Sequence, residues 1–282
     1  MLQVLLSGLA SGAIYGLVGM GFAIAFYVTR VINFAQGQLL MVGVMVAAAL
    51  MGAVTYLVAV RPVLAFDRSS FAWLVSTLGV ALILQNLAAI IWGPTSRPFP
   101  ALLNDRAVHI GGATLTLQEV AAIVVALFLA ASFELVRRKT LFGKVGMAVA
   151  YDPEMASAIG ANTGLIAVIA FAVAGMFAGV AGVLIGPITY ANPYLGNTYG
   201  IAGFVALMIG GTARPVAAMA GGLLLGVLEE TAKSVIDTQA SDWFPFVVVL
   251  VILLLAPQGL FAEAGRLREL GRFRRRPGEA AS

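Results

Sequence analysis

Residues 137–160 have the sequence RRKTLFGKVGMAVAYDPEMASAIG, a long polar segment inside an otherwise strongly apolar chain. Four of its first eight residues are cationic, namely Arg137, Arg138, Lys139 and Lys144. Lysine and arginine next to a membrane span resist transfer across the bilayer, so they mark the cytoplasmic side. The segment is therefore predicted to be a cytoplasmic loop with a membrane span on each side.

The second part of this loop predicts a short helix outside the membrane. Asp152 is suited to cap that helix, Pro153 to occupy its first position, and Glu154 to face the positive end of the helix dipole. Gly160 provides a stop. A capped helix between two spans is the shape expected of a part that another protein moves, whereas the alternative is an ordinary solvated connector.

The composition identifies an integral membrane protein. Of the 282 residues, 61% are hydrophobic and 11% are charged, against roughly 25% charged in a soluble domain. The absence of cysteine excludes disulfides and thiolate sites, and a single histidine, His109, argues against a histidine-built metal site. The net charge of +4 is concentrated in the predicted cytoplasmic segments, so it indicates topology and not a nucleic-acid partner.

These features predict an all-α, polytopic integral membrane helical bundle of about seven to eight transmembrane segments, some broken or re-entrant. One transmembrane domain is expected over residues 1–262, with the cytoplasmic loop at 137–163 and a basic cytoplasmic tail at 263–282. The apolar segments that form the expected spans are residues 4–28, 38–60, 71–92, 120–136, 165–213, 216–228 and 244–256.

Breaks between and within the spans are marked by proline and glycine. Residues 165–213 carry no charge and are too long for one crossing, so we expect them to divide near Pro187, Pro193, Gly196 and Gly200. A second break at residues 212–215 indicates either a binding site or gate, or a tight turn at the inner surface. The proline-rich residues 93–118 predict an outside loop or small hairpin.

Small and charged residues predict how the spans pack. Gly8, Gly12 and Gly16 recur every four residues, which gives the first span a face of nearly bare backbone for close packing. Glu229 and Lys233 are four residues apart and are expected to pair at a solvated helix end near the outer surface.

A cluster of neutral polar residues lies between the first two apolar segments. Asn33, Gln36 and Gln38 are hydrogen-bonding groups, and Gly37 allows a neighbouring backbone to approach closely. Polar groups at membrane depth are costly without partners, so such a cluster typically lines a cavity or a broken helix. The alternative is a water-exposed turn, which Arg30 favours. Gln85 and Asn86 are further polar positions in a later span, where hydrogen bonding between helices is the simpler explanation.

Several of these segments resemble one family of transporters. Residues 30–37, RVINFAQG, with Leu40, Met41 and Gly43, are similar to the signature of LivH-type permease subunits of the branched-chain amino acid (HAAT family) ABC transporters. Residues 148–154, AVAYDPE, and the glycine-rich residues 221–226 resemble the same family. Two departures are a methionine, Met147, where the family commonly has a basic residue, and about one helix fewer before Arg61.

The resemblance implies roles for particular residues. Asn33, Gln36 and Gly37 are expected near the substrate path, with Gln85 and Asn86 as further candidates. The loop is expected to dock on an ATP-binding subunit, and the residues that this implies are Ala150, Tyr151, Asp152, Pro153, Glu154, Ser157 and Gly160. It also implies a multi-pass protein of the bacterial inner membrane, surrounded by lipid.

The implied partners are a related, LivM-like permease subunit, two ATP-binding subunits and a periplasmic substrate-binding protein, with no nucleic acid. No cofactor is expected in this chain, because ATP would be bound by the partner subunits.

The function that follows is a permease subunit of an ABC importer for branched-chain or related amino acids. The chain lacks the G-x-x-x-x-G-K-[ST] phosphate loop, the H-E-x-x-H helix and the G-x-S-x-G elbow, so we do not expect an enzyme. The alternative is an ion-gradient-driven secondary transporter or channel subunit for a small polar solute. Such proteins generally carry ionisable residues inside their spans, and the expected spans contain almost none.

Overall fold

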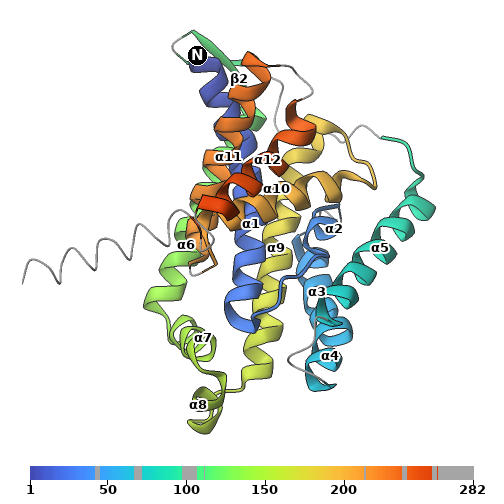
Figure 1. The fold of residues 1–282 in the computed structure, drawn as a ribbon, viewed down its shortest axis with the longest axis vertical. Coiled ribbons are helices and arrows are strands. Elements are labelled where there is room, and N and C mark those ends of the chain that lie inside the picture. The colour runs from blue at the N-terminus through green and yellow to red at the C-terminus, as the bar shows by residue number, and fades with distance from the viewer. Residues whose placement is uncertain are drawn as a thin grey trace, which may run out of the picture.

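The computed structural model describes residues 1–41, 45–66, 72–96, 107–110, 112–212, 214–236, 240–255 and 259. The predicted tail at 263–282, and residues 97–106 and 111 of the proline-rich loop, lie outside these ranges. Within them the chain is a helical bundle with one small β-hairpin (Figure 1). The predicted all-α membrane bundle is therefore confirmed.

Five helices in the described part of the chain are long and apolar enough to cross a membrane. They are α1 (Leu2–Thr29), α5 (Ala72–Trp92), α6 (Leu117–Lys139), α9 (Thr163–Thr189) and α11 (Pro215–Val235). Shorter helices are α2 (Gln36–Met41), α3 (Met45–Thr55), α4 (Arg61–Phe66), α7 (Leu141–Tyr151), α8 (Pro153–Ala158), α10 (Leu195–Gly210) and α12 (Ala240–Leu255). A π-helical turn, Tyr56–Val60, joins α3 to α4, and β1 (Ala107–Ile110) pairs antiparallel with β2 (Ala113–Thr116).

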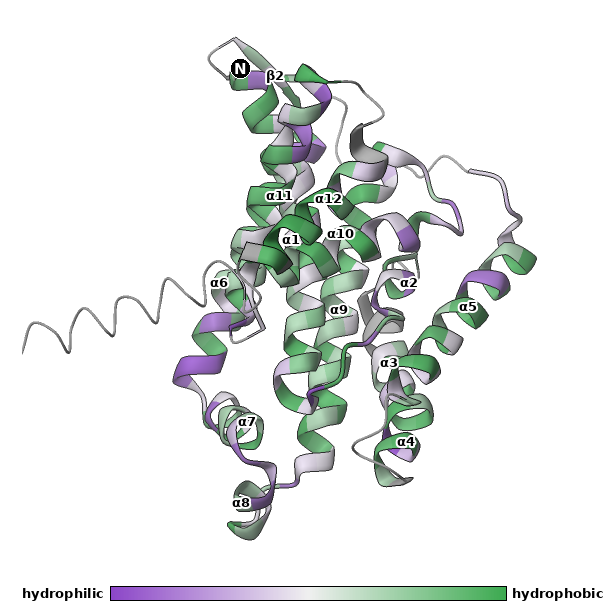
Figure 2. Cartoon of the chain, viewed as in Figure 1, coloured by the Kyte–Doolittle hydropathy of each residue, from purple (hydrophilic) through white to green (hydrophobic). Residues whose placement is uncertain are grey.

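The two ends of the bundle differ in what they carry. The hairpin and the start of α1 lie at one end, and α7 and α8 lie at the opposite end (Figure 1). Polar colours gather at the α7 end of α6 and around α8, whereas the helices between the two ends are mainly apolar (Figure 2). A cytoplasmic loop, as the charge rule predicts, would place the α7–α8 end on the cytoplasmic side.

The centre of the bundle is α1, which packs along α11 through its small residues. A Cβ placed on Gly8 would lie 2.7 Å from the Val227 Cα, and one on Gly12 would lie 2.7 Å from the Gly222 carbonyl oxygen. These distances are shorter than van der Waals contact, so the two backbones touch directly. The close-packing face predicted from the four-residue glycine spacing is confirmed.

The ends of α6 follow from local sequence. Thr116 caps the helix by accepting from the Glu119 backbone N–H at 3.2 Å, and the Glu119 carboxylate accepts from the Thr116 N–H at 2.8 Å. At the other end the Glu134 carboxylate accepts from both Arg137 and Arg138. The reciprocal cap and the basic last turn suit the two poles of the helix dipole.

The predicted break in residues 165–213 is present at residues 190–194, which include Pro193, whereas Pro187 and Gly196 lie within helices. α9 continues through Pro187 to Thr189, the chain leaves the helix at Tyr190 with a φ of 60°, and α10 begins at Leu195. A proline in the last turn removes one backbone hydrogen bond, which the helix tolerates so close to its end. Gly196 lies inside α10, where it serves close packing and does not break the helix.

The predicted solvated position of Glu229 is wrong. α11 continues past residue 228 to Val235, and Glu229 is only 3% exposed. The predicted pairing is present, because Lys233 Nζ lies 2.9 Å from Glu229 Oε1. A buried carboxylate needs such a partner, since the desolvation cost of an unpaired buried charge amounts to several kcal/mol.

Candidate functional site

The polar segment between α1 and α2 turns back into the bundle without forming helix. α1 ends at Arg30, whose left-handed φ of 58° stops the helix. The Asn33 side-chain Oδ1 then accepts from the Ala35 N–H at 3.1 Å, and its carbonyl accepts from the Gln36 N–H at 2.9 Å. Asn33 therefore forms the turn from which α2 starts, because a short amide side chain can replace a backbone partner.

The two glutamines in the first turn of α2 form hydrogen bonds to α9 and α10. Gln36 Nε2 donates to the Ala174 carbonyl of α9 at 2.7 Å, and Gln38 Nε2 donates to Asn197 Oδ1 of α10 at 2.7 Å. Gly21 of α1 faces Gln36, and a Cβ there would collide with the amide nitrogen. Residues far apart in the sequence are thus held together around one buried group of neutral amides.

Two atoms of this group have no partner. Asn33 and Gln36 are 0% exposed. In the described structure the Asn33 Nδ2 donor and the Gln36 Oε1 acceptor form no hydrogen bond. Leaving a buried polar atom unpaired costs about 1–3 kcal/mol. The segment is therefore sealed from water in this conformation while keeping one donor and one acceptor available for a polar solute.

Gly37 brings α2 against α10. A Cβ on Gly196 would lie 2.7 Å from the Gly37 carbonyl oxygen, and one on Gly200 would lie 3.1 Å from the Gly37 Cα. At Gly37 the contact with α10 is thus backbone against backbone, which matches the close approach expected there.

Gln85 and Asn86 do not join this group. Asn86 is exposed, and its Nδ2 donates to the Leu82 carbonyl of its own helix at 2.8 Å. Gln85 is half-buried, and within the described residues neither side chain forms a hydrogen bond to Asn33, Gln36 or Gln38.

The loop at the other end of the molecule has the predicted helix cap. Asp152 Oδ1 accepts from the N–H groups of Glu154 at 3.0 Å and Met155 at 2.9 Å, and Pro153 occupies the first helical position. Gly160 has a φ of +93°, a conformation that glycine adopts without strain. The cap and the stop predicted from residues 152–160 are therefore confirmed.

The outer surface of this loop is partly apolar. Tyr151, Met155 and Ile159 are 91%, 67% and 79% exposed, and we call these three residues the loop patch. Their spacing of four residues could have indicated a shared apolar surface from the sequence. Met155 and Ile159 were nevertheless not among the predicted docking residues. Pro153, Glu154, Ser157 and Gly160 are also exposed.

Ala150, which the resemblance placed among the docking residues, lies on the inner side of the loop. It is 5% exposed, so its side chain is not available to a partner in this conformation. Its carbonyl oxygen accepts from Arg30 Nη2 at 3.0 Å. This bond connects the loop to the residue at which α1 ends.

The described residues contain no cluster of three or more histidine, cysteine, aspartate or glutamate side chains that would hold a metal ion. What the chain brings together is a sealed group of neutral amides within the bundle and, at one end, a capped helix with exposed apolar side chains. The first arrangement suits hydrogen bonding to a polar solute without a net charge. The second suits docking of another protein.

Comparisons with known proteins give a consistent result. The family described as "Branched-chain amino acid transport system / permease component" has a model that matches residues 4–256. The high-affinity branched-chain amino acid transport system permease protein LivH of Escherichia coli (strain K12) is 29% identical over 294 residues, covering 92% of this chain and 94% of the relative.

Two further relatives come from other organisms. The permease protein BraD of Pseudomonas aeruginosa is 27% identical and covers 92% of this chain and 95% of the relative. The probable branched-chain amino acid transport permease protein LivH of Methanocaldococcus jannaschii is 25% identical and covers 86% of this chain and 87% of the relative. The alignment to the Escherichia coli protein is longer than this chain of 282 residues, so that relative carries residues that this chain lacks. No solved structure matches the chain significantly.

Proposed function

Because the chain belongs to the permease-component family of branched-chain amino acid transport systems, we propose that it is the membrane-spanning subunit of an ABC importer for these or related amino acids. It is a multi-pass protein of the bacterial inner membrane. The proposed partners are a related, LivM-like permease subunit, two ATP-binding subunits and a periplasmic substrate-binding protein. ATP would be bound by the partners, which agrees with the absence of a phosphate loop in this sequence.

The observation that carries the proposal is the loop patch next to a capped helix. Tyr151 and Ile159 expose most of their apolar surface beyond the bundle, at the end that the charge distribution assigns to the cytoplasm. Large apolar side chains clustered on a polar surface typically mark a protein-binding site. An ATP-binding subunit that grips this patch could move α8 and thereby rearrange the helices around the path.

The neutral amides of residues 33–38 support an amino acid as the solute. A zwitterion has no net charge, but its ammonium and carboxylate groups are each charged and need hydrogen-bond partners when they are buried. Asn33 Nδ2 and Gln36 Oε1 supply one donor and one acceptor. Because both are sealed in this conformation, α2 must separate from α9 or α10 before a solute can reach them.

Reconstitution tests the proposed class of transporter. The chain, co-purified with its partner subunits into vesicles, should take up amino acid only when ATP is supplied on the cytoplasmic face, and ionophores that collapse ion gradients should leave uptake unchanged. The control contains this chain and its permease partner without the ATP-binding subunits. Uptake driven by an ion gradient in that control would show that the chain is a secondary transporter.

Replacing Gln36 with leucine should reduce uptake at least tenfold while leaving membrane assembly near normal. Leucine fills a similar volume but removes the amide that faces the proposed path, and the lost hydrogen bond to Ala174 costs stability only about 1 kcal/mol. Radiolabelled uptake is measured at matched amounts of membrane protein.

Gln118 offers a matched control for this substitution. It is also a buried glutamine, it donates to the Leu184 carbonyl of α9 at 3.0 Å, and its Oε1 is also unpartnered. Gln118→Leu removes the same chemistry outside residues 33–38 and should leave uptake unchanged. Equal losses in both variants, or normal uptake in Gln36→Leu, would remove Gln36 from the substrate path.

A further inference from the structure

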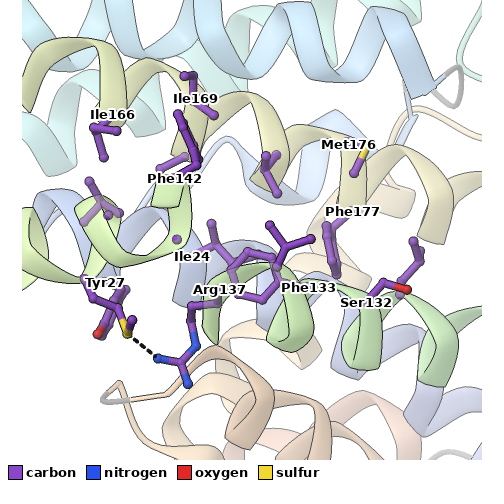
Figure 3. A pocket seen from close by; sticks show the side chains of 18 residues that line it. Ile24, Tyr27, Ser132, Phe133, Arg137, Phe142, Ile166, Ile169, Met176 and Phe177 are labelled. Atoms are coloured by element: carbon purple, nitrogen blue, oxygen red, sulfur yellow. Dashed lines mark hydrogen bonds between the residues drawn. The ribbon is translucent and has the colours of Figure 1, made fainter. Parts of the chain in front are cut away.

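A narrow apolar crevice lies near the α7–α8 end of the molecule, away from the amides of residues 33–38. It has a volume of about 300 Å³ and lies between α1, α6, α7 and α9. Figure 3 shows Ile166 and Phe177 of α9 toward opposite ends of the crevice. Its lining includes Ile24, Phe133, Phe142, Ile169, Met176 and Phe177.

The dimensions of the crevice fit a hydrocarbon chain. The lining on α9 extends from Ile166 to Phe177, a length of about 16 Å at about 1.5 Å per residue. The crevice is therefore long enough for part of an acyl chain.

The walls exclude water as a stable occupant. Apart from Ser132, Tyr27 and Arg137, the lining consists of apolar side chains and glycine. A water molecule needs about two to four polar partners, and an apolar cavity without them stays dry or takes up an apolar molecule. In a membrane protein the apolar molecules in contact with such an opening are lipid chains.

Basic residues of α6 and α7 line the crevice or stand close to lining residues in the sequence. Arg137 lines the crevice, and its guanidinium donates to the Met147 sulfur at 3.3 Å (Figure 3). The same guanidinium donates to the Glu134 carboxylate at 2.6 and 2.8 Å. Arg138 pairs with the same carboxylate, so the single negative charge of Glu134 is shared by two positively charged arginines. Lys139 and Lys144 are exposed and have no acidic partner within the described part of the chain.

We propose that this crevice binds one acyl chain of an anionic phospholipid of the cytoplasmic leaflet, with the headgroup phosphate against Lys139 and Lys144. Basic sites between transmembrane helices on the cytoplasmic side are suited to anionic headgroups. The bound chain would fill the space between α7 and the body of the bundle. Since α7 leads directly into α8, the lipid would also set the resting position of the loop patch.

Native mass spectrometry of the detergent-purified transporter tests the proposal, with phosphatidylglycerol and phosphatidylcholine as the added lipids. The wild-type protein should bind phosphatidylglycerol more tightly than phosphatidylcholine. Lys139→Gln and Lys144→Gln should each weaken the binding of phosphatidylglycerol about fivefold and reduce the preference over phosphatidylcholine. Arg137 and Arg138 remain in both variants, so the positive charge that sets the orientation of the loop is kept.

A second variant tests the acyl chain separately from the headgroup. Gly146 lines the crevice, and a Cβ on it would meet no atom within 4 Å, so Gly146→Leu can fill the space without a backbone clash. This variant should lose binding of both lipids. Gly79→Leu on α5 is the matched control, because a Cβ there also meets no atom within 4 Å and Gly79 does not line the crevice.

Three results would overturn the proposal. The first is equal binding of the two lipids by the wild-type protein. The second is unchanged lipid binding in Gly146→Leu. The third combines two observations: the wild-type protein binds no lipid, and Gly146→Leu loses a partner subunit from the complex. This combination would identify the crevice as a protein interface. Each result is independent of whether the transporter uses ATP.

Discussion

Replacing Gly222 with alanine should abolish accumulation of folded protein in the membrane. A Cβ at this position would collide with the backbone nitrogen and Cα of Gly16 in α1. No flexible side chain can move aside to relieve the collision, so α1 and α11 would have to separate. Overpacking a well-packed core costs typically 1–3 kcal/mol, and here the separation would also disturb Gly12 and Gly226 along the same contact.

The control for this prediction is Gly79→Ala on α5. A Cβ there meets no atom within 4 Å, and alanine favours helix over glycine by about 1 kcal/mol. This variant should accumulate normally and melt at or above the temperature of the wild-type protein. Accumulation of folded protein is measured by size-exclusion chromatography in detergent, and the melting temperature by thermal unfolding, with matched membranes of each variant. If Gly222→Ala gave a wild-type elution peak and melting temperature, the direct backbone contact between α1 and α11 would be wrong.

Replacing Tyr151 and Ile159 together with alanine should reduce ATP-driven uptake at least tenfold without loss of membrane protein. Both side chains are mostly exposed in this chain, so their truncation should change its stability by no more than about 0.5 kcal/mol. Truncating an interface residue that anchors binding costs about 2 kcal/mol or more. Uptake is measured in reconstituted vesicles, together with ATP hydrolysis and retention of the ATP-binding subunits.

Leu141→Ala is the matched control for the loop patch. Leu141 is 81% exposed and starts α7, the helix that Tyr151 ends, but it lies outside the loop patch. Its truncation removes a comparable exposed apolar side chain and should leave uptake unchanged. If the double variant transported at the wild-type rate, or if Leu141→Ala lost as much activity, the loop patch would have no specific part in coupling.

The features that the sequence predicted correctly depend on neighbouring residues. Asp152, Pro153 and Gly160 act within a few residues of one another, so the cap and the stop could be read directly from their order. The spacing of Gly8, Gly12 and Gly16 indicated close packing for the same reason, because residues four apart share one face of a helix. The five helices long enough to cross a membrane lie in apolar segments that the sequence predicted, whereas residues 38–60 are described only as the shorter elements α2, α3 and the π-helical turn.

The features that were missed depend on contacts between distant segments. Gln36 is separated by 138 residues from its partner Ala174, so no local pattern indicates which helix it binds. Glu229 looked like a solvated residue because Glu230 and Lys233 stand beside it, whereas the packing of α11 along α1 buries it. The exposure of Met155 and Ile159 also became clear only once α8 was placed against the bundle.

The hydrogen bond from Arg30 to the Ala150 carbonyl limits how far the end of α7 can move relative to the segment that carries Asn33. Arg30 precedes Asn33 by three residues, a distance that a fully extended chain spans in about 10 Å. A segment of three residues allows little independent movement. While the bond holds, a displacement of the end of α7 away from the membrane would pull Asn33 in the same direction. The packing that buries the Asn33 amide would then loosen together with the movement of α7.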